Sequence, residues 1–99
     1  MINHIVLFKL KNYSAEQKVE VLAELKGKLL ALKDKISELK YIQVGENYIL
    51  DSKSYDLALL THFDSVEDLD VYRVHPEHLK VVARIGETTV ERAAVDFVF

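Results

Sequence analysis

The chain has 99 residues, about the length of one domain, and its 13 Lys and Arg against 16 Asp and Glu give a formal net charge of −3. This balance argues against a nucleic-acid or anionic-membrane partner, because both require a concentrated basic surface. The sequence contains no cysteine, which excludes disulfides, thiol chemistry and cysteine-ligated zinc.

Hydrophobic residues make up 49% of the sequence, with only 3 Gly and 1 Pro, so we expect one ordered domain over residues 1–99. The longest apolar runs, such as residues 5–8, are far shorter than the roughly 18 residues of a membrane span. The N-terminal residues lack the basic and apolar regions of a signal peptide. We therefore expect a cytoplasmic protein without a membrane partner.

The first predicted element is a strand over residues 2–9, which is apolar on both faces and is typical of a strand packed on both sides. Ser14 and Gln17 then form a capping-box start for a helix. The helix carries an apolar stripe at helical spacing: Val19, Leu22, Leu25, Leu29, Leu32 and Ile36. We expect this stripe to pack on a sheet.

Two further strands are predicted in the middle of the chain. Residues 41–45 form the second strand, with Gly45 as a bulge or bend. The turn-rich residues 51–54 lead to the third strand, residues 55–63, which is also largely apolar on both faces. Its His62 lies among apolar neighbours and is interpreted as a core or interface residue.

The last third of the chain predicts two short helices and a strand. Ser65 caps the first helix, with Tyr72 on its apolar side. Pro76 ends that helix, because the residue before a proline is pushed out of the α region, and it suits the first position of a new helix. His75 is interpreted as the cap of this new helix, whose apolar residues are Leu79, Val82 and Ala83. Residues 90–99 form the fourth strand.

The predicted order β-α-β-β-α-β is that of a ferredoxin-like α+β domain, with a four-stranded antiparallel sheet and helices on one face. Two helices cover only one face of such a sheet. The other face is also apolar, and monomers rarely expose a large apolar patch. We therefore predict a homodimer in which two such faces pack against each other around a two-fold axis.

Three stretches together resemble the stress-responsive A/B barrel (Dabb) family. They are residues 3–9, the block over residues 65–78 and residues 95–97. The His-Pro-x-His run at 75–78 is the most specific part, and the resemblance covers essentially the whole chain. It implies a dimeric α+β barrel, in which two four-stranded sheets pack face to face.

The functions implied by this resemblance are diverse. Plant members include stress-associated proteins with no agreed activity and a polyketide cyclase that closes a ring by aldol condensation. The cyclase is believed to use a Tyr and a His that match Tyr72 and His78, assisted by residues that match His4 and Asp96. The wider barrel class includes cofactor-free monooxygenases and haem-degrading enzymes. The chain has no Trp and no haem-ligand signature, which disfavours the haem branch.

The residues themselves also predict a cluster. In the ferredoxin-like order the first and last strands are antiparallel neighbours, which brings His4 close to Asp96. A carboxylate there would fix the tautomer of the imidazole. His78 lies in the first turn of its helix, where the helix dipole favours the neutral form that a general base requires. Tyr72 would then bind or protonate a carbonyl oxygen.

Structural roles for the same residues remain open. His78 and Asp96 would also make sense as a buried hydrogen-bonded pair that holds the helix on the sheet, and Tyr72 as a packing residue. A metal site at His75, Glu77 and His78 lacks further ligands. The three glycines are isolated, so there is no phosphate-binding loop. We predict neither a metal nor a cofactor.

Three hypotheses follow. In the first, the protein holds a small apolar or aromatic ligand between sheet and helices, with His4, Asp96 and His75 as ligand contacts. In the second, it is a cofactor-free cyclase or lyase with Tyr72 and His78 as catalytic residues. In the third, it is a purely structural, stress-related dimer. A cavity that reaches Tyr72 and His78 would separate the first two from the third.

Overall fold

The computed structural model describes residues 1–50 and 53–99, so part of the predicted turn at 51–54 lies outside the described residues. The elements, in chain order, are β1 (Ile2–Leu10), α1 (Ala15–Leu30), the 3₁₀ helix η1 (Ala31–Asp34), β2 (Tyr41–Glu46), β3 (Leu57–Phe63), α2 (Val66–Val74), α3 (Pro76–Thr88) and β4 (Thr89–Val98). The predicted β-α-β-β-α-β order is confirmed, with the second helical segment divided into α2 and α3.

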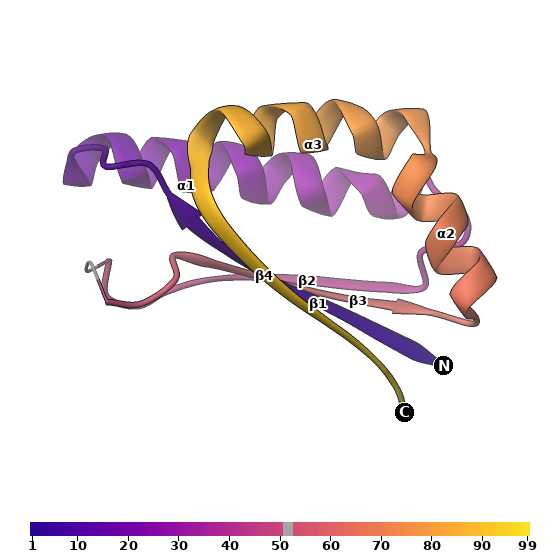
Figure 1. Ribbon diagram of the computed structural model, residues 1–99. Coiled ribbons are helices and arrows are strands. Elements are labelled where there is room, and N and C mark those ends of the chain that lie inside the picture. Colours follow the sequence, from indigo (N-terminus) through magenta and orange to yellow (C-terminus); the bar gives the residue numbers. More distant parts are fainter. Residues whose placement is uncertain (51–52) are drawn as a thin grey trace.

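The strands form one antiparallel sheet in the order β2-β3-β1-β4. Helices α1 and α3 run side by side over one face of this sheet, and α2 lies at one end of it (Figure 1). β1 is central because it pairs with both β3 and β4. This arrangement brings the two termini to the same end of the sheet, where Phe99 N donates to Met1 O at 3.0 Å.

The core fills the space between the helices and the inner face of the sheet. β1 alternates strictly between buried and half-buried residues. Its buried residues are Ile2, His4, Val6, Phe8 and Leu10. From the predicted helical stripe, the buried residues are Leu22, Leu25, Leu29, Leu32 and Ile36. The helix that we expected to pack on the sheet therefore does so through all but the first of its predicted positions.

That first position, Val19, is a correction to the predicted stripe. Val19 is 63% exposed, whereas Val21 is buried in its place. A step of three residues at about 100° per residue falls about 60° short of a full turn. Leu25, Leu22 and Val19 are separated by two such steps, so Val19 lies about 120° around the helix from Leu25 and faces the solvent.

The predicted bulge at Gly45 is also wrong. The register between β2 and β3 runs without interruption from Tyr41 to Glu46. The irregularity lies instead in the pairing of β1 with β4, where Lys9 pairs with Glu91 but Leu10 pairs with Thr89. At this point Leu10 N donates to the buried Asp56 carboxylate at 2.9 Å. Asp56 precedes β3, which begins at Leu57 and not at residue 55.

The helix starts agree with the sequence predictions. Ser14 and Gln17 form both bonds of a capping box, and the Ser65 side chain accepts from the backbone N–H of Asp68 at 3.1 Å. At the start of α3 the Nδ1 atom of His75 accepts from Glu77 N at 3.1 Å, which confirms His75 as a cap. The kink between α2 and α3 therefore has a local cause in His75 and the proline that follows it.

A salt bridge at the surface joins α3 to α1. Arg84 binds both carboxylate oxygens of Glu24, at 2.7 and 2.9 Å. The hydrogen bond from Arg84 lowers the pKa of Glu24 below its ordinary value. The core side of α3 consists of Val81, Ile85 and Thr88, whereas Ala83 is exposed.

The outer face of the sheet is apolar, and none of the helices described here covers it (Figure 1). It combines half-buried residues of the central strands with exposed residues of β4 and the C-terminus: Ile5, Leu7, Ala58, Leu60, Val95, Phe97 and Phe99. His62 lies on this face, where its ring packs between those of Tyr41 and Phe99, each with its centroid 4.6 Å away. In the described part of the chain, no helix has the length and apolar character to cross a bilayer.

Candidate ligand-binding site

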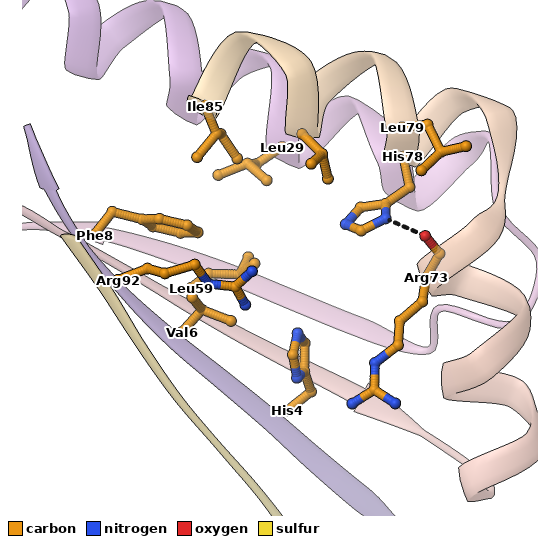
Figure 2. A pocket seen from close by; sticks show the side chains of 11 residues that line it. His4, Val6, Phe8, Leu29, Leu59, Arg73, His78, Leu79, Ile85 and Arg92 are labelled. Atoms are coloured by element: carbon orange, nitrogen blue, oxygen red, sulfur yellow. Dashed lines mark hydrogen bonds between the residues drawn. The ribbon is translucent and has the colours of Figure 1, made fainter. Parts of the chain in front are cut away.

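A cavity of about 260 Å³ lies between the inner face of the sheet and α3. Its body is apolar, and it is lined by Val6, Phe8, Leu29, Leu59, Leu79, Val82 and Ile85. Its polar groups are His4, Arg73, His78 and Arg92, which reach into the space from the sheet and from the helices (Figure 2). Leu79 and Val82, which the sequence placed on the apolar side of α3, therefore line this cavity.

The sheet brings His4 and Asp96 together as predicted. The two residues are direct partners in the β1–β4 register, and His4 Nδ1 is hydrogen-bonded to Asp96 Oδ1. The other carboxylate oxygen of Asp96 accepts from Arg73 Nη2 at 2.7 Å. Arg73 also binds Asp70 at 3.1 Å. The Asp96 carboxylate therefore orients the His4 ring and compensates the charge of Arg73. Through Arg73 it also connects the end of α2 to β4.

His78 enters the cavity from the first turn of α3 (Figure 2). Its Nδ1 is 3.1 Å from the backbone oxygen of Arg73. Since a carbonyl oxygen only accepts, Nδ1 is the donor, and in the neutral ring Nε2 is left as an acceptor. Burial, opposed in part by this hydrogen bond, lowers the pKa of His78 below its ordinary value. The site thus holds a neutral imidazole with one basic nitrogen available.

The predicted alternative, a buried hydrogen-bonded pair of His78 with Asp96, is not formed. His78 binds the Arg73 carbonyl, and the two carboxylate oxygens of Asp96 are taken by His4 and Arg73. The reason is geometric, because the direct partner of Asp96 in the register is His4 on the neighbouring strand.

Tyr72 lies beside the cavity but is not among its lining residues. Its side chain is fully buried, with the ring centroid 4.1 Å from that of His78 and 5.0 Å from that of Phe63. The His4 ring is 6.3 Å away. Burial raises the pKa of Tyr72 to about 12. Among the described residues its hydroxyl has no hydrogen-bond partner, which is unusual for a buried polar group.

His75 does not line the cavity, so the structure separates it from the other predicted site residues. Its Nδ1 serves the cap of α3, and its neighbour Glu77 pairs with Lys80 at 3.2 Å and Lys35 at 3.7 Å. Within residues 1–50 and 53–99, no group of three or more His, Cys, Asp or Glu side chains is arranged to hold a metal ion.

Arg73 and Arg92 are cavity residues that the sequence analysis missed. A signal for Arg92 exists, because it lies four residues before Asp96 in the same strand and so shares the face of Asp96. A positively charged residue on the face of a strand that the helices cover is uncommon, so it indicates a candidate binding site. Arg73 gives no such signal, since a basic residue in the last turn of a helix is ordinary.

Residues 2–99 match the family described as the stress responsive A/B barrel domain, Dabb. The chain belongs to the Dabb family. The residues quoted for the resemblance therefore identified the family correctly. Among curated proteins, none matches this Dabb domain.

Solved structures share the fold of this Dabb domain. A dimeric protein of unknown function and ferredoxin-like fold from Bacteroides fragilis is 37% identical, with 99% of this chain and 95% of that chain covered and a TM-score of 0.90. A dimeric ferredoxin-like protein of unknown function from Thermobifida fusca is 31% identical, with 99% and 90% covered and a TM-score of 0.79.

A hydroxynitrile lyase from Passiflora edulis has the same fold at 17% identity, with 99% of this chain and 92% of that chain covered and a TM-score of 0.76. An identity this low shows a common fold alone. The same fold therefore occurs in an enzyme and in proteins of unknown function, and the activity of this Dabb domain has to be argued from its own site.

The pH dependence of stability tests the burial of Tyr72. Its pKa is raised from 10.0 to about 12 in the folded chain, so between these pH values the unfolded chain loses the proton first. Stability is therefore lost as the pH rises through this window. We expect the wild type to lose on the order of 2–3 kcal/mol more than Tyr72→Phe between pH 9 and 12. Urea denaturation of both proteins at each pH measures the difference, and parallel curves would contradict the burial of this hydroxyl.

Proposed function

We propose that this protein binds a small, mainly apolar ligand in the cavity between its sheet and α3. The observation that carries the proposal is the pairing of apolar walls with a few convergent polar groups in one space of about 260 Å³. Ligand sites are typically built in this way, with apolar walls for affinity and a few polar groups for orientation.

The size of the cavity limits the ligand. A volume of about 260 Å³ lies just below the roughly 300–1,000 Å³ of ordinary small-molecule pockets. A single aromatic ring or a short aliphatic chain fits this space better than a nucleotide or a haem. The cavity reaches His78 but not Tyr72, so it meets half of the criterion set from the sequence. It still supports the binding hypothesis over the purely structural one, because a close-packed core leaves few voids larger than a water molecule.

Blocking the cavity tests this proposal. Val82 lines it and is 41% exposed, so Val82→Phe adds a ring at the cavity wall without forcing it into the packed core. With benzamide and hexanamide as neutral probes, we expect saturable chemical-shift changes at cavity residues of the wild type. Val82→Phe should bind both probes at least about tenfold more weakly. The control Val19→Phe adds the same ring on the exposed side of α1. Equal affinity in all three proteins, or no saturable change, would contradict the proposal.

A second candidate function is cofactor-free acid/base chemistry on the bound ligand. It is favoured by the contact between Tyr72 and His78, whose ring centroids are 4.1 Å apart. His78 supplies a neutral imidazole with a free acceptor nitrogen, as a general base requires. The unpartnered Tyr72 hydroxyl does not line the cavity, so it would donate to a carbonyl oxygen that becomes an enolate only if the cavity opened toward it.

Proton exchange tests this second function. Deuterium exchange at the carbon between the carbonyls of a small β-diketone reports removal of a proton by a base in the cavity. We expect His78→Ala to lower the exchange rate by about 10²–10⁴-fold, and Tyr72→Phe to lower it by a smaller factor. If both variants exchange at the wild-type rate, the acid/base assignment fails. If both lose exchange but still bind the diketone, a function limited to binding is contradicted.

We also propose that two copies pack through the outer face of the sheet into a dimeric α+β barrel. Support comes from the apolar residues of this face, such as Val95 at 55% and Phe97 at 42% exposed. The relatives from Bacteroides fragilis and Thermobifida fusca are described as dimeric. A second copy of the same face satisfies the requirement for a self-complementary surface around a two-fold axis.

Sedimentation tests the dimer. We expect the wild type to sediment as a dimer at micromolar concentration, and Val95→Glu to shift the equilibrium to the monomer by at least about tenfold in Kd, because it places a charge in an apolar contact. Val19→Glu introduces the same charge on the exposed side of α1 and should leave the dimer intact. A wild-type monomer at micromolar concentration would contradict the proposal.

A further inference from the structure

Arg92 is the least explained residue of the cavity. It lies in β4, opposite Phe8 in the β1–β4 register, so its side chain projects from the inner face of the sheet. Figure 2 shows its guanidinium pointing into the space that His78 enters from the helix side. Burial is the main cause of the lowered pKa of His78, and the positive charge of Arg92 adds to it. The charge of Arg92 therefore acts on His78, a group that lines the cavity.

Arg92 is exposed to solvent, and among the described residues the cavity lining offers no anion to pair with it. Within the part of the chain that the structure describes, this lining contains two arginines and two histidines but no Asp or Glu. Arg73 is compensated from outside the lining by Asp70 and Asp96. No ion pair or hydrogen bond joins Arg92 to a carboxylate among the described residues, and its strand neighbour Glu91 points to the opposite face.

We propose that the ligand of this cavity carries a carboxylate on its apolar body, and that Arg92 binds this carboxylate. The proposal rests on the proposed function, because it assigns the ligand class of the same site. It predicts an orientation as well, with the acid group toward β4 and the apolar part against Leu79, Val82 and Ile85 of α3.

The chemistry of the lining favours a carboxylate over other anions. A guanidinium has a planar fork of N–H donors that matches the two oxygens of a carboxylate. The remaining donors near Arg92 are few, since Arg73 is already engaged by two aspartates and His78 uses Nδ1 on a backbone carbonyl. A phosphate dianion would leave more charge unmatched in a space of about 260 Å³ with apolar walls.

Matched acids and amides separate this proposal from simple apolar binding. Benzoate and benzamide have the same size and shape, as do hexanoate and hexanamide, but only the acids are charged at pH 7. Affinities are measured by chemical-shift titration at fixed ionic strength for the wild type, Arg92→Gln, Arg92→Lys and Lys33→Gln. Lys33 is an exposed residue outside the cavity lining, so its variant removes one positive charge without changing the site.

We expect the wild type and Lys33→Gln to bind each acid at least about tenfold more tightly than its amide. Arg92→Gln should lose this preference and keep the affinity for the amides, whereas Arg92→Lys should keep part of it, because lysine retains the charge but not the fork. Equal binding of acid and amide by the wild type, or a preference that survives in Arg92→Gln, would overturn the assignment. In either case, binding of the amides upholds the cavity as an apolar site. If neither acid nor amide binds, both this inference and the proposed function are wrong.

Discussion

The carboxylate of Asp96 is the point on which the arrangement of the site depends. One of its oxygens is hydrogen-bonded to His4 on the neighbouring strand, and the other accepts from Arg73 at the end of α2. Without this carboxylate, the buried His4 ring would lose its hydrogen-bond partner at Nδ1, and Arg73 would keep only Asp70 as a counter-charge. Asp96 thus sets the orientation of His4, the position of α2 and the charge that remains in the cavity.

The contact between α2 and the sheet also determines where His78 and Tyr72 lie. Arg73 holds Asp96 with its side chain and accepts from His78 with its backbone oxygen. Tyr72, the residue before it, is thereby packed under His78 and against Phe63. Two neighbouring residues of one short helix therefore link the sheet, the buried hydroxyl and the imidazole that enters the cavity.

Much of this could be predicted from the sequence because it depends on local rules. The pairing of His4 with Asp96 follows from the order of the strands, and the cap at His75 follows from the proline after it. The position of Val19 was wrong because apolar spacings of three were taken as equal to a helical turn. A space between sheet and helices was one of three open hypotheses, and the position of Arg92 on the face of Asp96 was a signal that went unused. Whether helix and sheet leave a space between them depends on how α3 packs on the rest of the fold. Its contacts join residues far apart in the sequence, such as Arg84 and Glu24, which are 60 positions apart, and no local pattern encodes them.

β1 has a further consequence, because its alternate residues serve the two sides of the sheet. His4, Val6 and Phe8 line the cavity, while Ile5 and Leu7 lie on the uncovered outer face, so one layer of backbone separates the two. Deletion of a single residue in this strand would exchange the two sets. The imidazole would then face outward and the leucine inward, which would remove one of the polar groups of the cavity and place a titratable ring in an apolar surface. Substitutions in this strand therefore act on one side of the sheet at a time. Changes at His4, Val6 or Phe8 alter the cavity, and changes at Ile5 or Leu7 alter the outer surface.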